Sequence, residues 1–263
     1  MDVDPEAIGR NRPVDLGILG DARATLAALL EEVEAITGPR PPSERLQEYQ
    51  RQSREWEEGL AALATETKPV HPARLMTEAR RFFPHDGILA MDGGNTSMYC
   101  FQYLRVYQPR SFLWTSKFGH LGTGLPFAMA AKLAQPERTV LLITGDSAFG
   151  FNLQELETAY REKIPVICLV SCDYRWGMEV PGQLVSLGLE NLIGVDHSRA
   201  RYDKVAEAFG CFGAYVEDPA EIQPALAAAV RSGLPAVIQV VVDQGANVLP
   251  PGLVEYATAL GEV

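Results

Sequence analysis

Residues 143–178 read ITGDSAFGFNLQELETAYREKIPVICLVSCDYRWGM. This stretch begins at the end of an apolar run, residues 140–143, whose length and bulk predict a buried strand. The triplet Gly145-Asp146-Ser147 follows where that strand should end. Residues 152–163 then place apolar side chains at helical spacing, which predicts a helix. A strand, a polar turn and a helix in this order indicate an α/β unit.

A second apolar run, residues 166–170, predicts the next buried strand, which ends at Ser171-Cys172-Asp173. Two neighbouring parallel strands therefore deliver polar residues to the same edge of one sheet, where open α/β sheets bind ligands. Further strands are predicted at residues 87–91, 211–216 and 236–242, with helices between them. The expected fold is an α/β parallel sheet flanked by helices on both faces.

The triplet after the first strand suits a metal-bound phosphate. Asp146 can supply a hard carboxylate oxygen to a divalent cation such as Mg²⁺. The amides of Ser147 and Ala148 lie at an expected helix start and can face an anion. A second metal-binding group is then expected at the end of the next strand. The same triplet would also fit an ordinary turn before a helix cap, because short glycine-containing motifs are not specific.

The whole stretch resembles the diphosphate-binding signature of thiamine-diphosphate enzymes, which usually reads Gly-Asp-Gly, a spacer and then Asn-Asn. Its interior GFNLQELETA and its closing WGM resemble the superfamily of acetolactate synthases, 2-oxo acid decarboxylases and 2-hydroxyacyl-CoA lyases. The resemblance extends over residues 4–243. It implies thiamine diphosphate and Mg²⁺ as cofactors, and a sheet domain that binds the diphosphate.

The sequence departs from this signature at two positions. Ser147 stands where a third glycine is usual, although a small residue is kept. Cys172 stands where the metal-ligating Asn is usual, and Mg²⁺ prefers oxygen to sulfur. Asp173 could offer a carboxylate instead, and the carbonyl of Tyr174 would be the third protein ligand. The resemblance therefore implies a metal site made by Asp146, by Cys172 or Asp173, and by Tyr174.

Two further loops resemble cofactor contacts of the family. Residues 92–96, Asp-Gly-Gly-Asn-Thr, follow an expected strand, and two glycines there let the backbone approach a ligand closely. An ordinary turn with a helix cap would also explain them. In the loop before residue 126, the carbonyl of Gly119 would accept a hydrogen bond from the amine of the aminopyrimidine ring, and Leu121 would keep the cofactor bent.

Two residues near these loops are candidates for catalysis. His120 is a candidate because histidine is the usual acid–base residue near neutral pH, and it has either an acid–base role or a structural one. Glu179 matches an acidic residue beside the substrate in some family decarboxylases, or it is an exposed acid on a mobile loop. The resemblance implies a cofactor site formed by Gly94, Asn95, Thr96, Gly119, His120, Leu121, Gly145, Asp146, Ser147, Ala148 and Met178.

The flanking regions are expected to form separate parts. Residues 1–37 resemble the end of the central domain of these enzymes, with a short strand at 16–19 and a helix at 22–36. A lone strand and helix cannot bury both of their faces, so this part is expected to need a partner surface. The remaining parts are a linker with a surface helix, the cofactor domain, and a tail with a short helix, over residues 38–69, 70–245 and 246–263.

The composition argues against several classes of function. A net charge of −11 without a basic cluster argues against a nucleic-acid partner. No apolar run reaches the length of a membrane span and no signal peptide opens the sequence, so a cytoplasmic location without a membrane partner is expected. The four cysteines lack paired metal-site spacing and are expected to be reduced thiols. Neither a Gly-x-Gly-x-x-Gly nor a Walker-type fingerprint follows a strand, which disfavours other nucleotide-binding folds.

The resemblance also implies a partner. In the family, a glutamate that activates the cofactor lies in a separate pyrimidine-binding domain, early in a longer chain, and nothing here resembles that domain. Met1 stands where a strand of the central domain should already be running. We therefore expect the diphosphate-binding subunit of a split enzyme, in a hetero-oligomer such as a heterotetramer, acting on a 2-oxo acid or an acyl-CoA. The alternatives are a 2-hydroxyacyl-CoA lyase subunit and a non-catalytic subunit that binds the cofactor.

Overall fold

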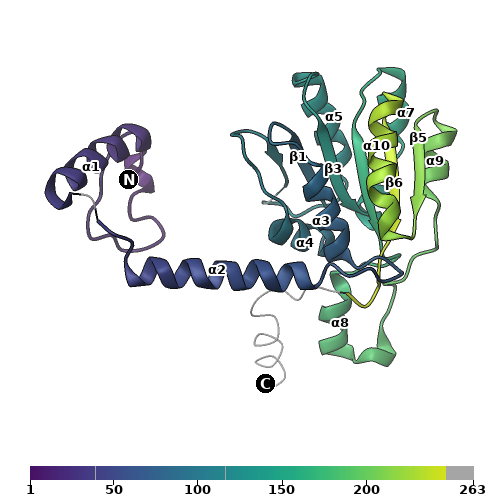
Figure 1. Ribbon diagram of the computed structural model, residues 1–263, viewed down its shortest axis with the longest axis horizontal. Coiled ribbons are helices and arrows are strands. Elements are labelled where there is room, and N and C mark those ends of the chain that lie inside the picture. Colours follow the sequence, from purple (N-terminus) through teal and green to yellow (C-terminus); the bar gives the residue numbers. More distant parts are fainter. Residues whose placement is uncertain (39, 116, 247–263) are drawn as a thin grey trace. The chain divides into compact units, whose positions relative to one another are not determined.

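The structure is a computed structural model that describes residues 1–38, 40–115 and 117–246 (Figure 1). It divides into two compact units, Met1–Trp56 and the part of the chain that starts at Glu57. The helix α2 (Glu44–Ala62) runs across this boundary. The expected tail helix lies outside the described residues.

The first unit contains a short 3₁₀ turn, η1 (Pro5–Ala7), and the helix α1 (Ala22–Thr37). Asp21 caps α1, because its carboxylate accepts the N–H of Ala24 at 2.9 Å. None of the described residues of this unit is buried, and α1 exposes a row of apolar side chains: Leu26, Leu29, Leu30, Val33 and Ile36.

The prediction of a strand at residues 16–19 is wrong. Leu19 makes only an isolated bridge to Asp2, and the segment before it has no regular structure. An extended segment becomes a strand when a neighbouring strand forms a ladder of hydrogen bonds with it. The described part of this unit contains no neighbouring strand, only the bridge to Asp2. The apolar residues at this position predicted a buried strand, but the described part of this unit provides no strand for them to pair with.

The second unit is built on a six-stranded sheet in which every pairing is parallel. The spatial order is β2-β1-β3-β4-β6-β5, and the predicted α/β parallel sheet is confirmed. The strands are β1 (Ile88–Asp92), β2 (Phe112–Leu113), β3 (Val140–Gly145), β4 (Ile167–Cys172), β5 (Phe212–Val216) and β6 (Ala236–Val241).

The central strands are apolar throughout because both of their faces are covered. In β3, Leu141 and Ile143 pack into one core cluster, whereas Val140 and Leu142 pack into the other. The strand β4 alternates in the same way, with Cys168, Val170 and Cys172 all in the second cluster. Continuous apolar runs are typical of parallel strands that are buried on both faces.

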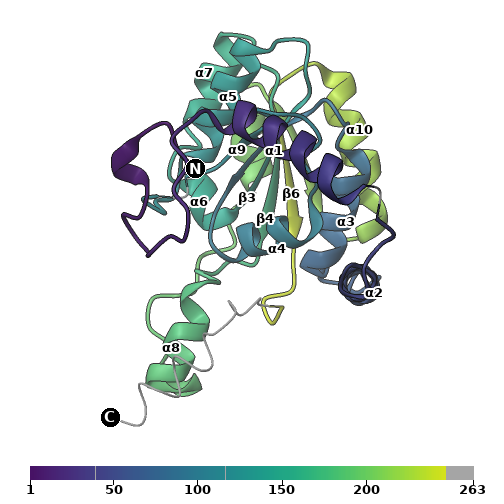
Figure 2. The ribbon, with the colours of Figure 1, turned by 90° about the vertical axis from the view of Figure 1, so that its left-hand side faces the viewer.

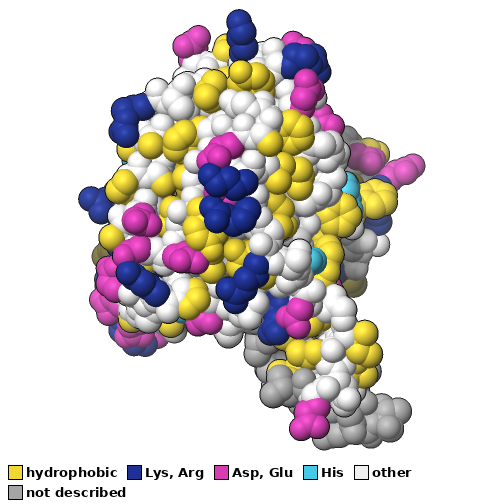
Figure 3. All heavy atoms as spheres, turned by 90° about the vertical axis from the view of Figure 1, so that its right-hand side faces the viewer, with side chains coloured by type: hydrophobic (Ala, Val, Ile, Leu, Met, Phe, Trp, Pro, Cys, Tyr) yellow, Lys and Arg dark blue, Asp and Glu magenta, His cyan; other side chains and the backbone are white. Residues whose placement is uncertain are grey.

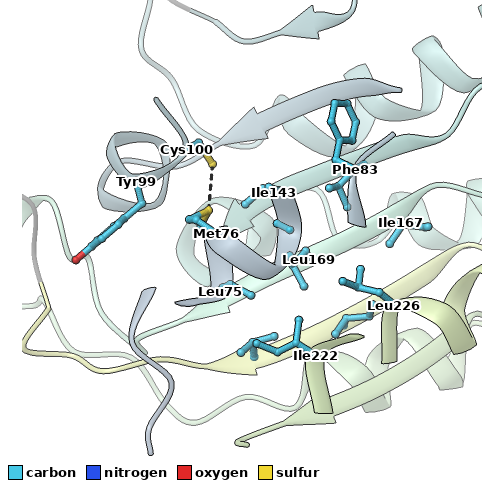
Figure 4. Close-up of a cluster of buried hydrophobic side chains, with 14 of the residues drawn as sticks. Leu75, Met76, Phe83, Tyr99, Cys100, Ile143, Ile167, Leu169, Ile222 and Leu226 are labelled. Atoms are coloured by element: carbon cyan, nitrogen blue, oxygen red, sulfur yellow. Dashed lines mark hydrogen bonds between the residues drawn. The ribbon is translucent and has the colours of Figure 1, made fainter. Parts of the chain in front are cut away.

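Helices cover each face. The first face carries α3 (Pro72–Phe82), α4 (Asn95–Tyr103) and α10 (Ile222–Ser232), which meet the sheet in the cluster drawn in Figure 4. The opposite face carries α5 (Gly124–Ala134), α7 (Glu155–Arg161) and α9 (Tyr202–Ala208). Among the described residues, no helix has both the length and the apolar character needed to cross a bilayer.

Several elements differ from the sequence predictions. The helix predicted at residues 152–163 is shorter, and a separate turn of helix, α6 (Asp146–Gly150), follows β3 directly. Residues after Met178, for which a mobile loop was one of two alternatives, form the helix α8 (Glu179–Leu187), which extends beyond the carboxyl ends of the strands (Figures 1 and 2). Figure 3 shows the face on the β5 and α9 side, where charges of both signs are interspersed. Apolar side chains gather on the protruding α8 region, where Leu184, Val185 and Leu187 are exposed.

The strand order reverses next to β1. From β1 the chain continues to β2 on one side, and then returns to β3 on the other side. The helices of these two connections lie on opposite faces of the sheet. The helix α4, between β1 and β2, lies on one face, and α5, between β2 and β3, lies on the other. Such a switch point leaves a crevice outside the carboxyl ends of the strands, so the sheet order alone directs a ligand toward the residues that follow β1 and β3.

Close packing between α9 and β5 yields the first prediction. A Cβ at Gly213 would collide with the backbone carbonyl oxygen of Asp203, which cannot move without shifting α9. Gly213→Ala should therefore lower the free energy of unfolding by about 1–3 kcal/mol, measured by urea denaturation. Gly59→Ala is the matched control, because a Cβ there meets nothing within 4 Å. It should be neutral or stabilise the helix by up to about 1 kcal/mol. Equal effects would contradict the packing.

Candidate active site

A cavity of about 200 Å³ opens at the switch point of the sheet. Its walls come from the segments that follow β1, β3 and β4, and from the loop before α5. Most of the residues that the sequence predicted for a site line it: Gly94, Asn95, Thr96, Gly119, Leu121, Gly145, Asp146, Ser147, Ala148, Asp173, Met178 and Glu179.

Three predicted residues do not line this cavity. The side chain of His120 is exposed, although its neighbours Gly119 and Leu121 are part of the wall. The thiol of Cys172 is fully buried and donates to the carbonyl of Val170 at 3.7 Å. Tyr174 is buried next to the wall.

Four lining residues were not predicted: Gly93, Arg175, Trp176 and Gly177. A signal for three of them was present, because they lie between two predicted residues, Asp173 and Met178. The fourth, Gly93, lies directly before Gly94.

Small residues keep the floor of the cavity low. A Cβ at Gly94 would lie 2.5 Å from the Cβ of Met178, and a Cβ at Gly145 would lie 3.1 Å from the hydroxyl of Thr96. Gly93 has φ of +103°, a conformation that side chains rarely adopt. These glycines let the backbone itself form the surface that a ligand meets.

The buried carboxylate of Asp92 joins two walls of the cavity. One oxygen accepts the N–H of Gly93 at 2.7 Å, and the other accepts those of Gly122 at 2.9 Å and Gly124 at 2.7 Å. Burial raises the pKa of Asp92, and these three hydrogen bonds oppose the rise. The side chain of Asn152 also donates to the carbonyl of Gly122, at 2.6 Å. The glycine-rich loop is therefore fixed to the end of β1.

Asp146 links the ends of β3 and β4. Its carboxylate accepts the N–H of Ser147 at 2.7 Å and that of Tyr174 at 2.8 Å. Tyr174 has a φ of +55°, a left-handed backbone conformation that follows β4 closely. Burial raises the pKa of Asp146 to about 6. This carboxylate is therefore both a structural acceptor and a buried acid that faces the cavity.

Asp173 places a second carboxylate at the same wall. Burial raises its pKa to about 7, and the negative charge of Asp146 adds to the rise. Cys172 differs, because burial raises the pKa of its thiol well above the usual value and the side chain packs in the apolar cluster. A metal binds the thiolate form of cysteine, and burial disfavours that form at Cys172. The oxygens of Asp173 are therefore more readily available to a metal than this sulfur.

The cavity combines features that suit a cation and an anion together. Two carboxylates on one wall repel each other, and a divalent cation between them would remove that repulsion. The helix α4 begins at Asn95, which lines the same cavity together with Thr96, and its cap residue Gly94 has no side chain to bond the first-turn amides. Among the described residues, no group of three His, Cys, Asp or Glu side chains is arranged around a metal position. Backbone oxygens would have to complete a metal site here.

The sequence signature described as "Thiamine pyrophosphate enzyme, C-terminal TPP binding domain" matches residues 92–240. A probable acetolactate synthase of Mycobacterium bovis is 35% identical over 232 residues, 88% of this chain and 42% of that protein. A sulfoacetaldehyde acetyltransferase of Castellaniella defragrans is 27% identical, over 88% of this chain and 41% of that protein. The chain thus spans less than half the length of these relatives.

A solved structure shows the same similarity. The thiamine diphosphate-dependent 4-hydroxybenzoylformate decarboxylase of Rhodococcus jostii RHA1 matches with a TM-score of 0.62 and 26% identity. The match covers 68% of this chain and 34% of that one.

Asp92 gives a prediction for stability. Asp92→Asn replaces one acceptor oxygen with an N–H₂ donor that would face backbone N–H groups, so the free energy of unfolding should fall by about 2 kcal/mol. Urea denaturation measures the change. Asp86→Asn is the control, since Asp86 is exposed and should change stability by less than about 0.5 kcal/mol. Unchanged stability of Asp92→Asn would show that the carboxylate does not hold the loop.

The acidic wall gives a prediction for pH dependence. Asp146 and Asp173 both have pKa values above 3.8 in the folded protein, so the folded state binds more protons than the unfolded chain. Without cations, the free energy of unfolding should therefore fall between about pH 4 and about pH 7. Each pKa unit corresponds to about 1.4 kcal/mol.

Urea denaturation across that pH range, in a chelator, measures this dependence. Asp173→Asn removes one of the two acids and the repulsion that it exerts on the other, so the variant should lose less stability than the wild type as the pH rises. Parallel curves for the two proteins would contradict the raised pKa values.

Proposed function

The chain belongs to the thiamine-diphosphate enzymes, as the match to their C-terminal cofactor-binding domain establishes, and from this premise we propose that it is the diphosphate-binding subunit of a split enzyme. The reaction would make or break a carbon–carbon bond next to a carbonyl, by decarboxylation or carboligation of a 2-oxo acid. The observation that carries the proposal is the cavity lined by the buried carboxylate of Asp146, by the half-buried carboxylate of Asp173 and by the start of α4. A cation bound to a diphosphate has this distribution of charge.

We assign the Mg²⁺ site to the carboxylates of Asp146 and Asp173 and to one backbone carbonyl. The carbonyl of Tyr174 already accepts the N–H of His197 at 2.8 Å, and Tyr174 does not line the cavity. Arg175 does line the cavity, and its carbonyl accepts one hydrogen bond, from the hydroxyl of Ser147 at 3.0 Å. Each of these two carbonyl oxygens keeps a second lone pair for a cation, but of the two residues only Arg175 lines the cavity. We therefore favour Arg175 over Tyr174 as the third ligand.

The diphosphate would lie against the glycines after β1 and β3. The first-turn amides of α4, at Asn95 and Thr96, are oriented for an anion, and glycine at positions 94 and 145 removes the side chains that would block its approach. The small residues Ser147 and Ala148 extend the same surface. This part of the proposal rests on backbone geometry rather than on any basic side chain.

When bound, thiamine diphosphate supplies a carbanion that attacks a carbonyl and then an electron sink for the bond that breaks. The residues of this chain would orient the cofactor. The carbonyl of Gly119 would accept a hydrogen bond from the cofactor's amine, and Leu121 and Met178 would fill the space around the cofactor. Glu179 begins α8 at the rim of the cavity and could hold a proton near the substrate. His120 could do so only if the loop that carries it turned toward the cavity, because its side chain is exposed.

A partner subunit would complete the enzyme. The chain matches less than half of its relatives, and the acetolactate synthases among them are considerably longer. We propose that the activating glutamate comes from a pyrimidine-binding subunit in a cytoplasmic hetero-oligomer. A 2-hydroxyacyl-CoA lyase subunit remains the alternative enzyme, and a subunit that binds the cofactor without turnover is the alternative non-enzyme.

Calorimetric titration of thiamine diphosphate with Mg²⁺ tests the proposal, on this chain alone and after mixing with the product of the adjacent reading frame. We expect tight binding and turnover of pyruvate in the mixture. Asp146→Ala should weaken binding by at least about 100-fold, because it removes a metal ligand, whereas Asp86→Asn should bind normally. Binding without turnover of any 2-oxo acid or acyl-CoA would favour the non-catalytic subunit. Absence of binding in both samples would overturn the cofactor assignment.

A further inference from the structure

We propose that His197 is a positioning residue for the metal site, and that it acts through the hydroxyl of Ser147. The proposal rests on the proposed function, since it assigns the carbonyl of Arg175 to the cation. Ser147 occupies the position where the family signature usually has glycine, and His197 lies far from it in sequence. The Nε2 atom of His197 is nevertheless 2.9 Å from the Oγ atom of Ser147.

Proton counting fixes the direction of this hydrogen bond. The Oγ atom of Ser147 lies 3.0 Å from the carbonyl oxygen of Arg175 and 3.4 Å from a carboxylate oxygen of Asp146, and the carbonyl and the ionised carboxylate can only accept. A hydroxyl has a single proton, which Ser147 must donate to one of them. The Nε2 atom of His197 must then donate its own proton to Ser147. If Nε2 were an acceptor, three acceptors would compete for one proton.

The segment that carries His197 is fixed to the same wall. Arg175 and Asp196 form an antiparallel bridge, and their side chains form an ion pair at 2.6 Å. The N–H of Trp176 donates to the carbonyl of Val195 at 2.8 Å. The ring of His197 packs against that of Trp176, with centroids 4.9 Å apart. The imidazole is therefore held in place by contacts that do not involve Ser147.

The contact lies beside a boundary between two cavities. A second cavity, of about 270 Å³, is lined by His197, Phe151 and Tyr202, and it shares Asp146, Ser147 and Trp176 with the first. Ser147 thus accepts a hydrogen bond from His197 on one side of this boundary and donates a hydrogen bond to the carbonyl of Arg175 on the other. Rotation of its hydroxyl would leave the carbonyl of Arg175 without this hydrogen bond. His197 prevents that rotation by occupying the acceptor side of the oxygen.

The two residues should therefore depend on each other. Glycine at position 147 offers no hydroxyl, so a histidine donor at position 197 would have nothing to act on. The role of His197 in cation binding should exist only when Ser147 is present. This interdependence separates a positioning role from a general contribution of His197 to folding.

A double-mutant cycle tests the dependence, with the dissociation constant of Mg²⁺–thiamine diphosphate measured by calorimetry on the chain with its partner subunit. His197→Phe keeps an aromatic ring against Trp176 but lacks the donor, and it should weaken binding by about 10-fold. His197→Gln retains an N–H donor and should stay within about threefold of the wild type. In the Ser147→Gly background, His197→Phe should cause no further weakening. Equal weakening in both backgrounds, or none in the wild type, would overturn the proposal.

Nuclear magnetic resonance tests the hydrogen bond without any cofactor. In protein labelled with ¹⁵N at its four histidines, the Nε2 proton of His197 should be protected from exchange with water, and Ser147→Gly should abolish the protection. Loss of the signal in His197→Gln assigns it. A ring protonated only at Nδ1 would overturn the proposal. If the wild type binds no thiamine diphosphate while this proton is protected, the proposed function fails and the role of His197 at a metal fails with it, but the hydrogen bond stands.

Discussion

Three backbone N–H groups converge on the buried carboxylate of Asp92, and the shape of the cavity depends on this interaction. The residues that donate are Gly93, Gly122 and Gly124. One side chain therefore sets both the turn after β1 and the loop that carries Gly119 and Leu121. A buried carboxylate is costly without partners, so a conformation that withdraws any of these N–H groups is penalised. The glycine-rich loop is consequently ordered by a charge in the core rather than by packing of its own side chains.

Asp146 repeats this arrangement one strand further along the sheet. It joins the end of β3 to the turn after β4 through the N–H of Tyr174. The difference lies in what each carboxylate faces. Asp92 does not line the cavity, whereas Asp146 does, together with Asp173. The first carboxylate therefore serves the fold alone, while the other two form an acidic wall whose mutual repulsion a bound cation could relieve.

Features that depend on neighbouring residues in the sequence were predictable, and features that depend on contacts between distant residues were not. The strands β3 and β4 were predictable, because apolar runs buried on both faces are local signals, and the residues at their ends followed from the parallel arrangement. Arg175 was not predicted, because the positive φ of Tyr174 after the end of β4 has no local signal in the sequence. His197 and the hydrogen bonds of Asp92 were also missed, since they join segments distant in sequence. The strand expected at residues 16–19 failed because no neighbouring strand pairs with it among the described residues.

The alternation of β4 explains how a cysteine can occupy position 172. Cys168, Val170 and Cys172 are spaced by two residues and all enter the same apolar cluster, so a side chain at position 172 is directed into the core while β4 remains regular. Asp173 comes next in this alternation and lines the cavity, whereas Tyr174 packs in the same apolar cluster as Cys172. A ligand at Asp173 would be a carboxylate in place of the neutral amide of the usual Asn. It would attract a divalent cation more strongly than an amide, and protons would compete with the cation for it as the pH falls toward 7, the value to which its pKa is raised.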